Sequence, residues 1–248
     1  MAGADLGEDT RLAAATGAWI CFEDEAGQTL RPPKARTWAR RGHTPVARVS
    51  GGASARVSVA GLACLKAGTP GRFFYRMRLY RRRKDDRRSL SEADYADLIA
   101  AAHRALGAPL IVVWDNLNTH RSTTMRQFTG AHPDWLTVVQ LPSYAPDLNA
   151  VEGAWSVMKN GLGNIAAASL DQLAGTMRGQ LRRIQRRPDL INGFLGQTGL
   201  TIEPEPPQPA DPDLSTPVSR IARRLPLLVG RRGFGNAPIS VHGAGSGG

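Results

Sequence analysis

Three acidic residues stand where a folded chain could bring them together at one metal site. Asp115 ends the apolar run 110–114, Asp24 follows the apolar run 18–22, and Glu152 lies near the start of an expected helix. In phosphodiester cleavage, two divalent ions about 4 Å apart activate the attacking oxygen and stabilise the leaving oxygen. Magnesium prefers oxygen ligands and needs few protein carboxylates. These three side chains are therefore the predicted catalytic and metal-binding residues.

Two of these carboxylates also have a structural interpretation. Asp115 could be an ordinary turn residue, because aspartate followed by asparagine is common turn chemistry. Glu152 could cap the helix, because Asn149 and Glu152 have the spacing of an N-cap residue and its partner. The proline-rich approach at 141–149 would make a stiff loop that aims the helix start, which favours a functional Glu152. Asp147 is a rival in this loop, and we assign it to the turn.

Asp24 has close neighbours of the same charge, Glu23 and Glu25. Alternation along a strand places Asp24 on the side shared by Ile20 and Phe22. The short side chain of aspartate also holds a metal ion more rigidly than glutamate does. Both arguments favour Asp24, and they leave the two glutamates as alternatives.

Several basic, polar and aromatic residues could contact a nucleic-acid backbone around these carboxylates. Each type of residue also has an interpretation without a role in DNA binding. The arginines could form a solvated rim, and the lysine could be an ordinary surface residue. The histidine could simply start a helix without a catalytic role, and this is the interpretation we favour for it. The candidates for DNA contact are Arg36, Trp38, Arg40, Arg41, Asn116, His120 and Lys159.

The charge of the chain favours a polyanionic partner. Its 248 residues carry a formal net charge of +11, with a sequence pI of about 10.7. Such a surplus promotes nucleic-acid binding through counterion release and steering, although it could also serve solubility alone. The two cysteines, Cys21 and Cys64, lie in apolar runs and are predicted to be buried free thiols. No run reaches the roughly 18 apolar residues of a membrane span, and no signal peptide is apparent, so we expect an intracellular protein without membrane contact.

The pattern of apolar residues predicts a mixed α/β domain. Antiparallel strands come first, then alternating helices and strands, which indicates a mixed sheet with helices on both faces. The predicted strands are 18–22, 56–65, 72–80, 110–114 and 136–141. The predicted helices are 91–106, 119–129, 149–159 and 169–187. Residues 1–15 are interpreted as a lead-in, 16–200 as the catalytic domain, and the Pro-, Gly- and Arg-rich segment 201–248 as a disordered tail.

Three ordered blocks resemble the catalytic domain of mariner-like bacterial insertion-sequence transposases. The first holds FEDEAG at 22–27, RTW at 36–38 and RGHTP at 41–45. The second is WDNLNTH at 114–120, and the third is LPSYAPDLNAVE at 141–152. The resemblance extends from about Trp19 to Leu200. One position differs from the usual pattern, because Ala150 stands where the family commonly has a proline.

This resemblance implies a ribonuclease H-like fold and a DDE (Asp, Asp, Glu) triad formed by Asp24, Asp115 and Glu152. It implies cleavage at the ends of a mobile element and transfer of the freed 3′-hydroxyl to target DNA, with Mg²⁺ or Mn²⁺ bound as two ions. It also implies a location with the nucleoid in a bacterial cytoplasm, and a homodimer that pairs two DNA ends.

The family carries a helix-turn-helix region before its catalytic domain, whereas only 23 residues precede Asp24. End recognition is therefore expected on a separate polypeptide or an upstream frame. One alternative is a truncated, non-catalytic DNA-binding remnant that regulates transposition. Another is a general ribonuclease H-like nuclease that needs no end recognition.

Overall fold

The computed structural model describes residues 12–13, 15–33, 40–43, 55–142, 146–163, 165–200 and 202. Every helix and strand discussed below lies in the compact unit formed by residues 1–206. The predicted tail lies outside the described residues except for Ile202. Among the helices of the described part, none has the length and apolar character needed to cross a membrane.

A five-stranded mixed sheet with the order β3-β2-β1-β4-β5 forms the centre of the domain. Strands β1, β2 and β3 pair as an antiparallel meander, whereas β4 and β5 extend the sheet in parallel to β1. The predicted meander followed by parallel strands is therefore confirmed, and this is a ribonuclease H-like sheet. The strands are β1 Trp19–Thr29, β2 Arg56–Lys66, β3 Thr69–Tyr80, β4 Leu110–Trp114 and β5 Leu136–Gln140.

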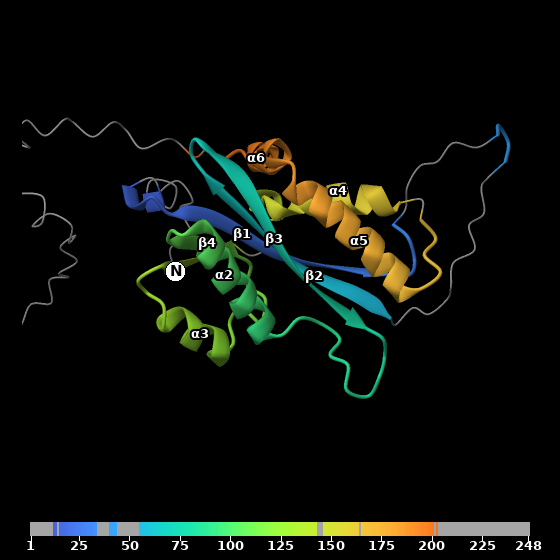
Figure 1. The fold of residues 1–248 in the computed structure, drawn as a ribbon, viewed down its shortest axis with the longest axis horizontal. Coiled ribbons are helices and arrows are strands. Elements are labelled where there is room, and N and C mark those ends of the chain that lie inside the picture. The colour runs from blue at the N-terminus through green and yellow to red at the C-terminus, as the bar shows by residue number, and fades with distance from the viewer. Residues whose placement is uncertain are drawn as a thin grey trace, which may run out of the picture. The chain divides into compact units, whose positions relative to one another are not determined.

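Helices cover both faces of this sheet, as Figure 1 shows. Helices α4, α5 and α6 pack in one apolar core, and α2 and α3 contribute to a second core on the opposite face. The helices are α2 Glu92–Leu106, α3 Thr123–Gly130, α4 Val151–Leu162, α5 Leu170–Gln185 and α6 Pro188–Gln197, with a short 3₁₀ turn at Pro146–Leu148.

Local sequence signals fix the ends of α2 and α5. Ser91 and Asp94 form the predicted capping box of α2, and Gly107 ends that helix with a positive φ of 62°. Ser169 caps α5 by accepting a hydrogen bond from the backbone N–H of Gln172. These signals are local, so the sequence alone is sufficient to place them.

Other boundaries differ from the prediction because tertiary contacts set them. Strand β1 continues past the expected end at Phe22 to Thr29, because its pairing with β2 extends to that residue. Helix α3 begins only at Thr123, after a turn over residues 118–121. Helix α4 begins at Val151 and not at Asn149. Helix α6 was not predicted, although Pro188 at its first turn is a typical helix-start residue.

The alternation of side chains along β1 divides the two cores. Ile20 and Phe22 belong to the core beneath α4–α6, whereas Trp19 and Cys21 belong to the core beneath α2 and α3. Cys64, the strand partner of Cys21, is also buried, and both thiols are free as predicted. Consecutive acidic residues further along β1 therefore face opposite sides of the sheet.

Candidate active site

Asp24 and Asp115 lie at neighbouring positions of the sheet. Strands β1 and β4 are parallel, and their last paired residues are Phe22 and Val113. Each aspartate follows two residues after its member of this pair. Because β4 ends at Trp114, Asp115 projects from the carboxyl end of a central strand, where open α/β sheets place their sites.

Helix α4 connects Asp24 to Glu152. The indole Nε1 of Trp155 donates a hydrogen bond of 2.9 Å to Oδ2 of Asp24. Burial raises the pKa of Asp24 to about 7, the Trp155 hydrogen bond opposes this rise, and the negative charges of Glu152 and Glu23 add to it. Glu152 lies exposed in the first turn of α4, close enough for its charge to act on Asp24.

The capping interpretation of Glu152 is wrong. Ala150 is the N-cap residue of α4, and its side chain makes no capping hydrogen bond. The side chain of Asn149 instead donates to the backbone carbonyl of Glu23 at 2.9 Å and accepts from the N–H of Val151 at 3.1 Å. Asn149 therefore ties the start of α4 to β1, and the carboxylate of Glu152 has no capping role.

Gly61 leaves the space that Trp155 occupies above the sheet. It is the β2 partner of Asp24, and a Cβ added to it would lie 2.7 Å from the Trp155 ring and 3.0 Å from Phe73. We expect Gly61→Ala to lower the free energy of unfolding by roughly 1–3 kcal/mol, because overpacking displaces these rings. Urea unfolding measures this change.

A matched glycine provides the control for this substitution. Nothing lies within 4 Å of a Cβ added at Gly175 in the middle of α5. Gly175→Ala should therefore be neutral or stabilising by up to about 1 kcal/mol, because alanine is the better helix former. An unchanged unfolding free energy in Gly61→Ala would contradict the packing argument.

The Asp115 carboxylate is held on one side and open on the other. Its Oδ1 accepts a hydrogen bond from the backbone N–H of Leu117 at 3.0 Å and contacts Nδ1 of His120 at 3.1 Å. The hydrogen bond from His120 lowers the pKa of Asp115. The side chain remains 48% exposed, so it is ionised and accessible at neutral pH.

His120 lies inside the protein and not on the DNA-facing surface. Its side chain is 1% exposed, and its Nε2 lies 2.9 Å from Oε2 of the fully buried Glu23. Burial alone would lower the pKa of His120, but the contacts with Asp115 and Glu23 raise it to about 10. Burial raises the pKa of Glu23. We treat His120 as an imidazolium, because carboxylates contact both of its ring nitrogens.

The other predicted DNA-contact residues differ in how accessible they are. Arg40, Arg41 and Lys159 are exposed, and Lys159 follows Glu152 along α4. Asn116 donates to the backbone carbonyl of Leu141 at 3.2 Å and so links the loops after β4 and β5. The burial of His120 rules out the direct DNA contact considered for it. Arg36 and Trp38 lie outside the described residues.

The donor atoms suit a hard divalent cation, although they are not gathered into a complete ligand set. Among the residues that the structure describes, no group of three or more His, Cys, Asp or Glu side chains could hold a metal ion as placed. Magnesium is usually held by one or two carboxylates with water and phosphate completing its shell. The negative charge that Glu152 adds to Asp24 is the kind of repulsion that a cation between them would relieve.

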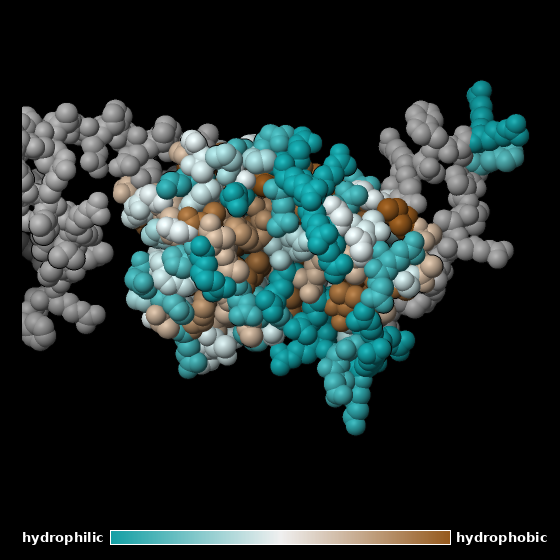
Figure 2. Space-filling view, viewed as in Figure 1, coloured by the Kyte–Doolittle hydropathy of each residue, from teal (hydrophilic) through white to brown (hydrophobic). Residues whose placement is uncertain are grey.

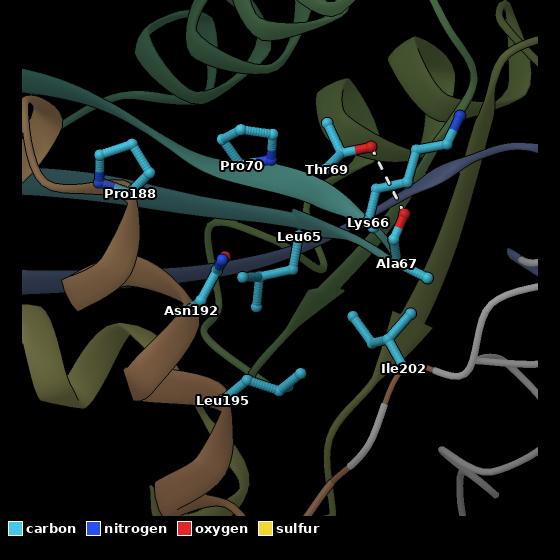
Figure 3. A pocket seen from close by; sticks show the side chains of 10 residues that line it. Leu65, Lys66, Ala67, Thr69, Pro70, Pro188, Asn192, Leu195 and Ile202 are labelled. Carbon is cyan, nitrogen blue, oxygen red and sulfur yellow. Dashed lines mark hydrogen bonds between the residues drawn. The ribbon is translucent and has the colours of Figure 1, made fainter.

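Two hollows lie near the helices on this face. One is lined by Glu152 and by residues from the start of α4 and the end of α6, including Asn149, Phe194 and Thr198. The other lies between the β2–β3 hairpin and α6 (Figure 3), and no carboxylate lines it. The first hollow therefore adjoins the acidic site, whereas the second is separate from it.

Sequence reasoning missed the roles of Glu23 and Trp155. Glu23 was considered only as a rival of Asp24, and Trp155 was not a candidate for the site. Trp155 is buried, and it also donates a hydrogen bond to Asp24. Strand alternation indicates that Glu23 points away from Asp24, into the opposite core. A glutamate buried there needs a cationic partner. This requirement could have indicated from sequence that Glu23 contacts a basic side chain inside the protein.

A mixed five-stranded sheet with Asp24 in central strand β1, Asp115 directly after the neighbouring strand β4, and Glu152 on a helix near Asp24 defines a ribonuclease H-like domain with an acidic site. The chain belongs to the DDE superfamily endonuclease family, whose model matches residues 19–174. No curated protein matches the chain in sequence.

Several solved structures of Mos1 transposase are similar to the chain at low sequence identity. A pre-cleavage Mos1 transpososome is 15% identical, with a TM-score of 0.49, over 80% of this chain and 60% of that one. The Mos1 strand transfer complex is 16% identical, with a TM-score of 0.45, over 74% of this chain and 56% of that one. The catalytic domain of Mos1 mariner transposase is 14% identical, with a TM-score of 0.41, over 74% and 84%. The chain thus spans little more than half of the Mos1 chain in the strand transfer complex.

Proposed function

We propose that this chain is the catalytic domain of an insertion-sequence transposase, which cleaves DNA and transfers strands with the help of divalent metal ions. The observation that carries the proposal is the placement of Asp24 in β1 and of Asp115 directly after the adjacent parallel strand β4, with Glu152 coupled to Asp24 by charge. Membership of the DDE superfamily endonuclease family supports it.

In this proposal Asp24, Asp115 and Glu152 are the ligands of Mg²⁺ or Mn²⁺, bound as two ions. Such ions would activate the attacking oxygen and stabilise the leaving oxygen. The protein contributes rigid placement, because Asp24 lies in β1, Asp115 follows β4 directly, and Glu152 lies on a helix that Asn149 ties to β1. It also contributes local negative charge, because Glu152 and Glu23 add to the rise that burial causes in the pKa of Asp24.

Exposed basic residues supply the proposed DNA-binding surface. Arg40, Arg41 and Lys159 face solvent, and the loop after β3 forms a hydrophilic projection in Figure 2. This loop exposes six basic residues: Arg81, Arg82, Arg83, Lys84, Arg87 and Arg88. Such residues bind the phosphate backbone without regard to sequence. Arg36 and Trp38 remain part of the proposed surface.

The proposal extends to partners. The DNA would be the element ends and a target, with end recognition on a separate helix-turn-helix polypeptide and two copies of this chain pairing the ends. The proposed location is the nucleoid of a bacterial cytoplasm. Co-purification with a polypeptide encoded upstream, and the mass of the complex on end DNA, would test these partners.

Nicking of supercoiled plasmid tests the proposed chemistry. Wild-type chain should convert plasmid to the nicked form in Mg²⁺ or Mn²⁺ and not in EDTA, because the carboxylates act through the metal. An RNA–DNA hybrid serves as the second substrate, and its preferential cleavage would indicate a general nuclease instead. Salt-sensitive DNA binding without nicking of either substrate would overturn the catalytic proposal and favour a regulatory remnant.

A further inference from the structure

A buried bridge of three side chains supports the Asp115 carboxylate from inside the protein. His120 stands between Glu23 on β1 and Asp115 after β4, with its two ring nitrogens 2.9 Å and 3.1 Å from their carboxylate oxygens. Glu23 is fully buried, and the His120 ring is almost so. The bridge thus joins the middle of β1 to the loop directly after β4, beside Asp24 in the first strand and at Asp115 in the loop.

We propose that His120, anchored by Glu23, is a positioning residue that fixes the Asp115 carboxylate with Oδ1 held by the protein and Oδ2 left for a metal ion. This inference rests on the proposed function, since it assigns Asp115 as a metal ligand. His120 touches neither the DNA nor the metal in this proposal, and acts only through Asp115.

Aromatic neighbours fix the orientation of the His120 ring. Trp114 stacks on it with ring centroids 4.6 Å apart and planes 7° from parallel. Tyr95 meets it edge-on at 4.9 Å and 84°. Tyr95 is itself held by a 2.7 Å hydrogen bond from its hydroxyl to Oε2 of Glu25. A ring enclosed in this way is hindered from turning, so Nδ1 stays against Asp115 and Nε2 stays within 2.9 Å of Glu23.

The hydrogen bonds to Asp115 are unequal between its two oxygens. Among the described residues, the hydrogen bond from the backbone N–H of Leu117 and the contact from the His120 ring both end on Oδ1. Leu117 alone would leave the carboxylate free to rotate, whereas two donors from different directions restrain it. Partners of this kind orient metal ligands in many proteins, and their loss typically weakens metal affinity by about 10–100-fold.

The position of Glu23 in β1 relates the location of Asp115 to that of Asp24. It is adjacent to Asp24 in β1, and alternation directs it to the face opposite Asp24. A rigid contact from Glu23 through His120 therefore keeps Asp115 at a fixed place relative to Asp24. Their separation decides whether both can contribute to one metal site.

The test compares variants that retain the packing of the ring. His120→Phe keeps the aromatic stack and removes both nitrogens, whereas His120→Asn retains one short donor near the position of Nδ1. Because His120→Phe leaves Glu23 buried without its partner, the double variant Glu23→Gln/His120→Phe removes that charge as well. His103→Phe is the matched control, since His103 also stacks on a tryptophan, Trp135, at 4.0 Å.

Two readouts are measured on the full chain, after thermal unfolding has confirmed that each variant folds. Mn²⁺ affinity is determined by calorimetry without DNA, and nicking of plasmid is measured over a range of Mn²⁺ concentrations. We expect His120→Phe and the double variant to bind Mn²⁺ about 10–100-fold more weakly. We expect raised Mn²⁺ to restore part of their nicking, with the KM for DNA unchanged. His120→Asn should lie between them and wild type, and His103→Phe should match wild type.

Wild-type Mn²⁺ affinity and nicking in the folded double variant would overturn the positioning role and leave the proposed function intact. Equal losses in His120→Asn and His120→Phe would also overturn it, because the retained donor would then have no effect. A wild-type chain that neither binds Mn²⁺ nor nicks DNA would overturn the proposed function itself, and the inference with it.

Discussion

Asp115→Asn should abolish Mg²⁺-dependent nicking of plasmid DNA while the affinity for DNA stays near the wild-type value. Asparagine keeps an oxygen that can accept from Leu117 and His120, so the local structure is retained. It removes the negative charge that a divalent ion would bind. Loss of a residue that only supports a metal ligand typically lowers metal affinity or activity by about 10–100-fold. Loss of the ligand itself should have a larger effect, so we expect the nicking rate to fall by at least ~100-fold. Binding should persist because it depends on the exposed arginines and lysines.

An exposed acid elsewhere on the domain provides the control. Asp134 lies on the surface before β5, away from the strand ends that carry the site, and Asp134→Asn should nick as wild type does. Nicking rates and DNA affinity at two salt concentrations would be measured for both variants. If Asp115→Asn lost binding and nicking by the same factor, the separation of catalysis from binding would be refuted.

Asp24→Asn should make the metal-free protein more stable at pH 8. The folded-state pKa of Asp24 is raised to about 7 from an ordinary value of 3.8. The folded chain therefore holds a proton between these pH values that the unfolded chain has lost. Ionised Asp24 destabilises the fold fully above pH 7, and this cost disappears as the pH falls toward 4. It amounts to about 4 kcal/mol at most, at 1.36 kcal/mol for each pKa unit.

Urea unfolding at pH 5 and pH 8 measures this effect. Stability of the wild type should rise relative to Asp24→Asn as the pH is lowered, with Asp134→Asn as the reference for an exposed carboxylate. Mn²⁺ should stabilise the wild type more at pH 8 than at pH 5, because the ionised carboxylate binds the ion. A pH-independent difference between wild type and Asp24→Asn would show that Asp24 has an ordinary pKa.

The order of the strands could be predicted from sequence because each strand contains an apolar or alternating segment that stands out from its surroundings. The run 110–114 became β4 without change, since all of its side chains are buried. The far half of β1 was missed because residues 23–29 include three acids and a glycine, which do not resemble a strand. Pairing with β2 holds that half in place, and such pairing joins residues too distant in sequence for a local pattern to show.

The candidate acids were predictable, but their surroundings were not. Asp24, Asp115 and Glu152 stand out as charges at the ends of apolar segments, and the motifs that contain them are ordered along the chain. Glu23 is buried against His120, which lies in the turn before α3 and not in the helix predicted at 119–129. The hydrogen bond from Trp155 to Asp24 depends on the absence of a side chain at Gly61, which leaves room for the indole ring. Both arrangements are products of tertiary packing.

The opposite orientations of Glu23 and Asp24 also constrain how this chain can evolve. Loss of one residue from the first half of β1 would shift the strand register and turn every following side chain to the other face. The carboxylate beneath α4 would then come from Glu25, and Asp24, whose side chain is one methylene shorter, would take the place of Glu23 beside His120. Substitutions can accumulate in this strand one at a time, but insertions and deletions there remove the site in a single step, so length variation belongs in the loops.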